Sequence, residues 1–188
     1  MSTHSHDRRY GSAAERLRAP ARVALLEIPR VVSLSREGIT AVRVLDVGTG
    51  TGLFAEAFAQ SGLDVTGIDP NEELLAVARR HSAGVFLVGT AEKLPFEDRS
   101  FDLVMMGHVL HETDDRAAAL REARRVARHR VAILEWPYVQ EEQGPPLAHR
   151  LQESEILSLA HDAGFTSIHT TILSHMRLYR LTPRRQKA

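Results

Sequence analysis

Apolar runs alternate with amphipathic segments along most of the chain. A near-continuous apolar run from Val42 to Val47 is typical of a parallel strand that is covered on both faces. Further predicted strands cover residues 63–69, 85–88, 101–106, about 130–135, about 165–173 and 176–181. Apolar positions at helical spacing predict helices over residues 53–60 and 154–163, after Pro70 and Asn71, and after a cap at Thr113 or Asp114.

This alternation predicts an α/β fold with a Rossmann-like doubly wound sheet of about seven strands. We expect the sheet to be mostly parallel, with an antiparallel C-terminal strand. Short N-terminal helices, divided at Pro20 and Pro29, precede it. We expect a flexible N-terminus over residues 1–9 and a single domain over residues 10–188. Within that domain, residues 10–40 form a helical cap and residues 41–182 form the core.

A glycine-rich turn follows the first predicted strand. Gly48, Gly50 and Gly52 alternate with threonines, so a ligand can approach main-chain N–H groups without obstruction by side chains. The second predicted strand ends at Asp69, whose carboxylate is suited to accept hydrogen bonds from both hydroxyls of a ribose. Capping of the next helix is the alternative role for this aspartate. In such sheets the ligand lies beyond the carboxyl ends of the strands, where both features fall.

The composition narrows the classes of function. Hydrophobic residues make up 43% and charged residues 26%, as in ordinary globular proteins. The formal net charge is zero and aromatic residues make up 5%, so we expect no nucleic-acid partner. The apolar runs are too short for a membrane span and no apolar signal region is evident, so we expect a cytoplasmic protein without a membrane partner. Without cysteine, disulfides, thiolate nucleophiles and cysteine-based metal sites are excluded.

The glycine turn alone leaves the nucleotide open. A dinucleotide fingerprint requires G-x-G-x-x-G, and Leu53 stands where its third glycine belongs. An NAD-dependent oxidoreductase therefore remains an alternative with weakened support.

The run VLDVGTGTG at residues 44–52 resembles the first motif of class I S-adenosylmethionine-dependent methyltransferases. GID at 67–69, GTAEKLPFEDRSFDLV at 89–104 and VLH at 109–111 follow in the order of that family. ILEWPY and DAGF are similar to segments of the type 11 small-molecule methyltransferases, which include ubiquinone/menaquinone-type enzymes. The resemblance covers about residues 40–181. It implies S-adenosyl-L-methionine as the cofactor, S-adenosylhomocysteine as the product and a small-molecule methyl acceptor.

The resemblance also implies which residues bind the cofactor, and they lie at or after the carboxyl ends of predicted strands. Around the methionine end of the cofactor they are Asp46, Gly48, Thr49, Gly50, Gly52, Gly107 and His108. Around the ribose and adenine they are Asp69, Pro70, Asn71, Thr90, Ala91 and Glu92. Tyr10 and Arg16 lie in the segment that folds over the cofactor in relatives. Relatives usually carry a Lys-Pro-Gly-Gly-like turn before the fifth strand; residues 127–130 differ, which predicts a shorter or differently built turn.

Methyl transfer requires a base only when the acceptor must lose a proton. His108 and His111 are the candidates for catalysis, because histidine titrates nearest to neutral pH. Glu112 and Glu135 fall in the same region, and packing of His111 under the next helix is the alternative to catalysis. Residues 111–115 do not match the zinc motif HExxH, because Asp115 replaces its second histidine, so we predict no metal site.

Residues 8–36 and 140–150 are expected to roof the acceptor pocket. The sequence leaves open the acceptor, the choice among O-, N- and C-methylation, and the oligomeric state. The terminal strands offer an edge through which a homodimer could form. A non-catalytic S-adenosylmethionine-binding scaffold on the same fold is a further alternative.

Overall fold

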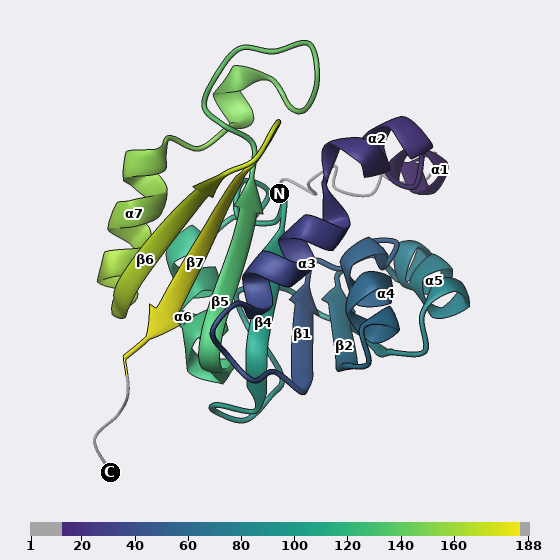
Figure 1. Ribbon diagram of the computed structural model, residues 1–188, viewed down its shortest axis with the longest axis horizontal. Coiled ribbons are helices and arrows are strands. Elements are labelled where there is room, and N and C mark those ends of the chain that lie inside the picture. The colour runs from purple at the N-terminus through teal and green to yellow at the C-terminus, as the bar shows by residue number, and fades with distance from the viewer. Residues whose placement is uncertain (1–12, 185–188) are drawn as a thin grey trace, which may run out of the picture.

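A seven-stranded mixed sheet runs through the computed structural model, which describes residues 13–184 (Figure 1). Its strand order is β3-β2-β1-β4-β5-β7-β6. The strands are β1 (Arg43–Val47), β2 (Asp64–Asp69), β3 (Val85–Val88), β4 (Phe101–Gly107), β5 (Ala127–Glu135), β6 (Phe165–Ile172) and β7 (Arg177–Pro183). The first five are parallel, and β7 runs antiparallel to both β5 and β6. The predicted doubly wound α/β fold with an antiparallel C-terminal strand is confirmed.

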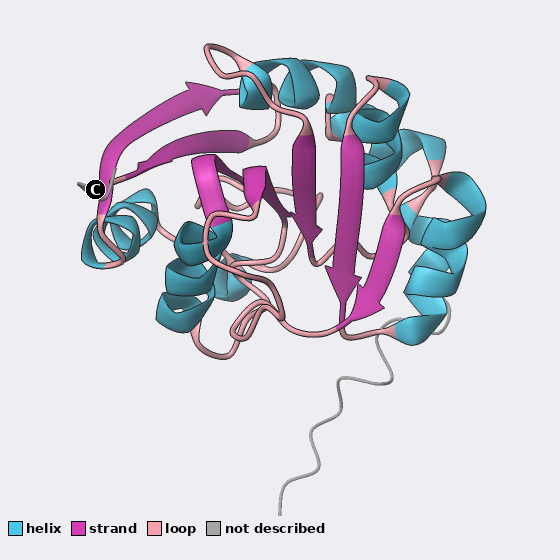
Figure 2. Cartoon of the chain, turned by 90° about the horizontal axis from the view of Figure 1, so that it is seen from below, coloured by secondary structure: helices cyan, strands magenta, loops and turns pink. Residues whose placement is uncertain are grey.

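Helices cover both faces of this sheet (Figures 1 and 2). They are α1 (Ala13–Leu17), α2 (Pro20–Leu25), α3 (Ile28–Arg36), α4 (Leu53–Gln60), α5 (Glu72–His81), α6 (Arg116–Val126) and α7 (Glu153–Asp162), with the short 3₁₀ helix η1 (Leu147–His149). As predicted, Pro20 and Pro29 divide the N-terminal segment into short helices. α3, α4 and α5 share one hydrophobic core with the sheet, whereas α6 and α7 share a second.

Each core is built from the apolar stripe of its helices. Phe58 of α4 and Leu120 of α6 are fully buried, on opposite faces of the sheet. Burial of one such side chain contributes about 1.5–3 kcal/mol to the free energy of folding. Because both faces are packed, the central strands are held firmly, and functional side chains project from their carboxyl ends.

Several predicted boundaries need correction. Val42 precedes β1, and its side chain is 53% exposed; its N–H donates to the Asp102 carboxylate. β5 begins three residues before the predicted position, at Ala127, which pairs with Phe101. It follows α6 directly, so the unusual connection at residues 127–130 contains no turn. The cap of α6 is Asp115 instead of Thr113 or Asp114, because its carboxylate is placed to accept the Ala118 N–H.

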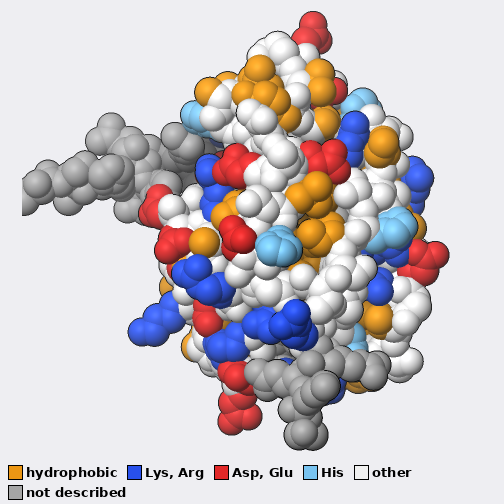
Figure 3. Space-filling model, turned by 90° about the vertical axis from the view of Figure 1, so that its left-hand side faces the viewer, with side chains coloured by type: hydrophobic (Ala, Val, Ile, Leu, Met, Phe, Trp, Pro, Cys, Tyr) orange, Lys and Arg blue, Asp and Glu red, His pale blue; other side chains and the backbone are white. Residues whose placement is uncertain are grey.

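Other predictions concern the surface and the ends of the chain. Residues 1–9 and Tyr10 lie outside the described residues. Among those described, no helix is long and apolar enough to cross a bilayer. The face drawn in Figure 3 carries basic, acidic and histidine side chains among hydrophobic ones. The expected absence of a nucleic-acid partner stays a prediction, as does the homodimer, although β6 does form one edge of the sheet.

Candidate functional site

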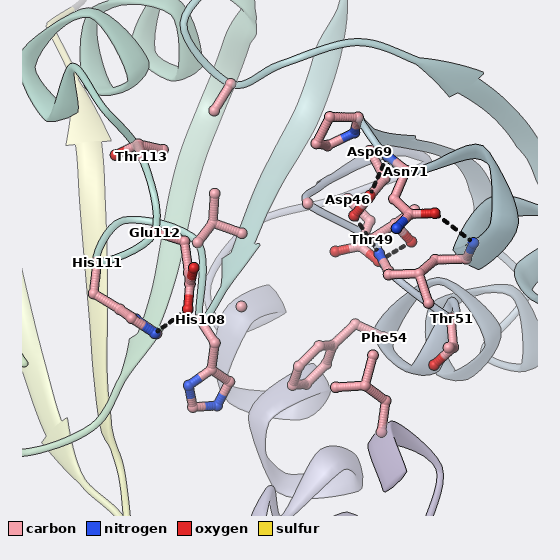
Figure 4. A pocket seen from close by; sticks show the side chains of 18 of the residues that line it. Asp46, Thr49, Thr51, Phe54, Asp69, Asn71, His108, His111, Glu112 and Thr113 are labelled. Carbon is pink, nitrogen blue, oxygen red and sulfur yellow. Dashed lines mark hydrogen bonds and ion pairs between the residues drawn. The ribbon is translucent and has the colours of Figure 1, made fainter. Parts of the chain in front are cut away.

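A cavity of about 1050 Å³ lies beyond the carboxyl ends of β1, β2 and β4. Two groups of side chains face each other across it (Figure 4). We call the group with Asp46, Thr49, Asp69 and Asn71 the carboxylate end. The histidine end comprises His108, His111 and Glu112, together with Glu135 and Trp136 from the end of β5 and the residue after it.

Asp46 lies in β1 and ties the glycine turn to α4. Its carboxylate accepts hydrogen bonds from the Thr49 hydroxyl at 2.6 Å and from the Ala55 N–H at 3.1 Å. The side chain is almost completely buried. Burial raises the pKa of Asp46 to about 7, the two hydrogen bonds oppose this shift, and the charge of Asp69 adds to it. A carboxylate that is costly to ionise therefore lies directly under the glycine turn.

Asp69 ends β2 and clamps the same turn from the other side. One carboxylate oxygen accepts the Gly50 N–H at 2.8 Å, and the other accepts the Asn71 N–H at 2.9 Å. Burial raises the pKa of Asp69, and these two hydrogen bonds oppose the shift. The cap of α5 is Asn71, whose side chain accepts the N–H groups of Glu73 and Leu74. The capping alternative for Asp69 therefore belongs to Asn71, and the Asp69 oxygens keep lone pairs for a ligand.

The three glycines of the turn play different parts. Gly48 and Gly50 both have positive φ, and both line the cavity. A Cβ on Gly48 would lie 2.3 Å from Val109, whereas one on Gly50 would meet only open space. Gly52 does not line the cavity, and its contact with the cofactor stays a prediction. A Cβ there would lie 2.9 Å from Ala78 of α5, so this glycine also allows the turn and α5 to pack closely.

His108 follows β4 in the left-handed region, with φ of 60°. Its N–H donates to the Leu134 carbonyl at 2.9 Å, and its ring centroid lies 5.4 Å from that of Trp136. Both ring nitrogens are shielded from solvent and have no hydrogen-bond partner among the described residues. Burial lowers the pKa of His108 well below its usual value, and the charges of Arg22 and His111 lower it further. The ring is therefore neutral near pH 7.

His111 has the opposite character. Its Nδ1 lies 2.7 Å from a carboxylate oxygen of Glu135, and its Nε2 lies 3.4 Å from Glu112. The main-chain N–H of His111 also donates to the second oxygen of Glu135, at 3.2 Å. Burial lowers the pKa of His111, but the hydrogen bonds and charges of Glu112 and Glu135 outweigh it and raise the pKa to about 9. The ring is therefore held in place by two carboxylates instead of simply packing under α6.

Residues 45–134 match a family model described as "Methyltransferase domain" (Methyltransf_11). This range carries the glycine turn, Asp69 and both histidines of the site. This part of the chain is a methyltransferase domain of the class I S-adenosylmethionine-dependent family.

Relatives of known name support this membership over part of the chain. A demethylmenaquinone methyltransferase of Thermotoga maritima is 40% identical over 111 residues, which are 56% of this chain and 48% of the relative. A malonyl-[acyl-carrier protein] O-methyltransferase of Erwinia pyrifoliae is 39% identical over 100 residues, which are 53% of this chain and 38% of the relative. The matched regions thus span less than half the length of these two curated relatives.

Solved structures match over more of the chain. A SAM-dependent methyltransferase from Aquifex aeolicus is 25% identical, with a TM-score of 0.76, over 91% of this chain and 97% of that chain. Magnesium protoporphyrin IX methyltransferase from Synechocystis, solved with bound SAH, is 17% identical, with a TM-score of 0.69, over 86% of this chain and 84% of that chain. At this identity the second match shows the fold alone.

In this methyltransferase domain, the remaining predicted site residues also reach the cavity. They are Pro70, Thr90, Ala91, Glu92 and Gly107, together with Arg16 of the N-terminal segment. Arg18 holds that segment over the cavity, because its guanidinium donates to the Thr51 carbonyl and pairs with Glu56 of α4.

Residues 140–150 were expected to roof this part of the cavity, and Gly144 and Pro145 do line it, but the sequence did not show how Arg150 holds the loop. Arg150 is buried there, donates to the carbonyls of Pro137, Gln143 and Pro145, and lies 5.3 Å over the Trp136 ring. It thereby fixes the loop that brings Gly144 against Trp136. No local pattern in the sequence links Arg150 to carbonyls five to thirteen residues away.

Proposed function

We propose that the chain transfers a methyl group from S-adenosyl-L-methionine to a small-molecule acceptor. One observation supports this most directly: a single cavity joins the clamped glycine turn to a buried pair of histidines. The first is suited to a nucleoside-containing cofactor and the second to a reacting acceptor. S-adenosylhomocysteine is then the product.

The described residues fit this cofactor. Lone pairs on the Asp69 oxygens suit the two hydroxyls of a ribose, and the open space at Gly50 leaves main-chain groups accessible. Leu74 and Pro70 give an apolar wall, and Asn71 lies beside it for the adenine. The Asp46 carboxylate suits a cationic amine at the methionine end. The bound cofactor supplies a methyl group already activated by a sulfonium, so the protein has only to position the reactants and exclude water.

The two histidines take different parts in this proposal. His108 is neutral and has unpartnered ring nitrogens, so it is suited to accept a proton from the acceptor. Its lowered pKa makes it a weak base, which favours acceptors whose own proton is already acidic. His111 is cationic near pH 7 because of its carboxylate partners, which hold both ring nitrogens, so it is suited to position Glu112 and Glu135 at the histidine end of the cavity instead of removing a proton.

The roof over the cavity supports a small-molecule acceptor. Arg16 and Arg22 of the N-terminal segment and Gly144–Pro145 of the loop after β5 line the same cavity from above the sheet. A volume of about 1050 Å³ lies at the upper end of ordinary ligand pockets, which hold about 300–1,000 Å³, and accommodates a cofactor and a compact acceptor together. Two relatives are named for a demethylmenaquinone and for a malonyl-[acyl-carrier protein], so these chemistries come first in a screen.

The direct test uses S-adenosylmethionine labelled in its methyl group. The full chain is incubated with a panel of quinols, carboxylic acids, phenols and amines, and transfer of the label is measured by mass spectrometry. We expect label in at least one acceptor, with one S-adenosylhomocysteine formed per methyl group transferred. Binding of the cofactor without transfer to any class would indicate a scaffold that binds S-adenosylmethionine, and no binding would reject the proposal.

A further inference from the structure

Three potential metal ligands meet at the histidine end. His108, His111 and Glu135 each offer one ligand atom, and these atoms all lie within 4.8 Å of one another. They come from the residue after β4, from the turn that follows it and from the end of β5. Parallel pairing of β4 with β5 brings these separate segments together at one rim of the sheet.

The ring of His108 has no hydrogen-bonding role in this structure. Both of its nitrogens are shielded from solvent and without a partner among the residues described. Buried polar atoms in folded proteins are nearly always satisfied, so an exception calls for a partner such as an ion. His108 also has positive φ, which costs a non-glycine residue of order 1 kcal/mol or more and concentrates at functional sites. The segment therefore places an unsatisfied imidazole beside the His111–Glu135 pair.

We propose that His108, His111 and Glu135 bind a divalent transition-metal ion, Zn²⁺ or a cation of similar chemistry. Two imidazole nitrogens and one carboxylate oxygen form a ligand set that prefers such ions over Mg²⁺ or Ca²⁺, which favour oxygen. Three protein ligands leave a position open, as in catalytic zinc sites. Because His108 and His111 line the cavity, that position faces it.

The surroundings of His111 already match those of a metal-bound histidine. A ligating histidine usually donates its other ring N–H to a carboxylate or carbonyl, which fixes the ring. Here Nδ1 lies at 2.7 Å from Glu135, and Nε2 lies at 3.4 Å from Glu112. The second oxygen of Glu135 is held by the main-chain N–H of His111. The ion would take the place of the proton shared between Nδ1 and Glu135.

Geometry and charge allow the ion to enter. Tetrahedral ligands at about 2.0–2.1 Å from zinc lie about 3.3 Å apart. The ligand atoms lie within 4.8 Å of one another, so the most distant pair must approach by at most about 1.5 Å, whereas His111 Nδ1 and Glu135, at 2.7 Å, must move apart by about 0.6 Å. Arg22 acts electrostatically on His108 and opposes a cation, whereas the carboxylates of Glu112 and Glu135 compensate for it. The HExxH comparison at residues 111–115 did not predict this set, because two of its three ligands lie outside that segment.

This inference goes beyond the proposed methyl transfer. In the metal-free protein the His108 nitrogens are available to the acceptor's proton. With the ion bound, one of them is a ligand, and an oxygen or nitrogen atom of the acceptor would fill the open position. Metal binding can be measured without cofactor or acceptor, so its failure would leave the proposed function standing.

The test titrates the full chain, treated with chelator and free of any histidine tag, with Zn²⁺ by calorimetry. Titration with Co²⁺ then reports coordination through its visible absorption bands. We expect one ion per chain. Glu135→Gln and His108→Asn should each weaken binding at least tenfold, since even loss of an outer partner costs about 10–100-fold in metal affinity. We choose asparagine at position 108 because it tolerates the left-handed backbone conformation of His108.

Matched variants separate this site from the other histidines. His161→Asn changes an exposed histidine of α7 and should leave affinity unchanged, as should the double variant His4→Asn/His6→Asn. Circular dichroism and stabilisation by S-adenosylhomocysteine report whether each variant is folded. No binding by the parent chain, unchanged binding by Glu135→Gln and His108→Asn, or loss of binding only in the His4/His6 variant would overturn the proposal.

Discussion

The two ends of the cavity are built in different ways. At the carboxylate end, Asp46 and Asp69 are satisfied by N–H and hydroxyl groups of the turn between them and the start of the next helix. At the histidine end, His111 depends on Glu135, which is 24 residues away, and the His108 ring has no partner among the described residues. The first end is a rigid cradle formed by local contacts, and the second is assembled from distant segments and is incompletely satisfied.

This contrast suggests a division of labour. Backbone groups that are fixed before the ligand arrives give affinity at little cost in ordering. Unsatisfied side chains facing a cavity are available for chemistry or for an ion. We therefore expect changes at the carboxylate end to alter cofactor affinity, and changes at the histidine end to alter the acceptor reaction.

The largest expected effect on stability comes from Asp46→Asn. Burial raises the pKa of Asp46 from 3.8 to about 7, so ionisation destabilises the folded state. The penalty grows as pH rises above the unfolded pKa and reaches its full value above about pH 7, where it is at most about 4 kcal/mol. Urea unfolding at pH 4.5, 6 and 8 should show Asp46→Asn gaining stability over the parent as pH rises. A difference that is independent of pH would contradict this.

Asp69→Ala is expected to weaken S-adenosylhomocysteine binding at least about 100-fold. The change removes two charge-assisted hydrogen bonds that fix Gly50 and Asn71, each worth about 1.5 kcal/mol or more. Asp64→Ala, at the exposed opposite end of the same strand, is the control and should bind normally. Calorimetry measures both. Equal affinity of the two variants for S-adenosylhomocysteine would show that the carboxylate end does not bind the cofactor.

Gly144→Ala tests the loop that roofs the histidine end, and its expected effect is smaller than that of Asp69→Ala. A Cβ at Gly144 would lie 2.7 Å from the Trp136 ring, so the loop must shift, at a cost of about 1–3 kcal/mol. Gly38→Ala is the matched control, because Gly38 also has positive φ but a Cβ at this position would meet only open space. We expect Gly144→Ala alone to raise the KM for the acceptor, with both variants binding S-adenosylhomocysteine normally. Equal loss of cofactor affinity in both would show that the two ends are not separable.

The sequence predicted the parts of the molecule that depend on short-range patterns. Each apolar run is a local pattern, and Asp69 lies only 19 residues after Gly50 of the glycine turn, so these features led to the fold and the carboxylate end. The packing of Gly52 against Ala78 of α5 could not be predicted, because the spacing of the glycines does not show which helix lies beside the turn. The partners of His111 and Trp136 depend on which strands pair and on where a loop folds back. No local pattern contains that information.

The most direct test of the central claim measures which nucleotide stabilises the full chain. S-adenosylhomocysteine at about 100 times its dissociation constant should add about 2.7 kcal/mol to the free energy of unfolding, and NAD should add none. The Asp69→Ala variant should lose most of this gain. Stabilisation by NAD, or no stabilisation by either S-adenosylmethionine or S-adenosylhomocysteine, would contradict the account.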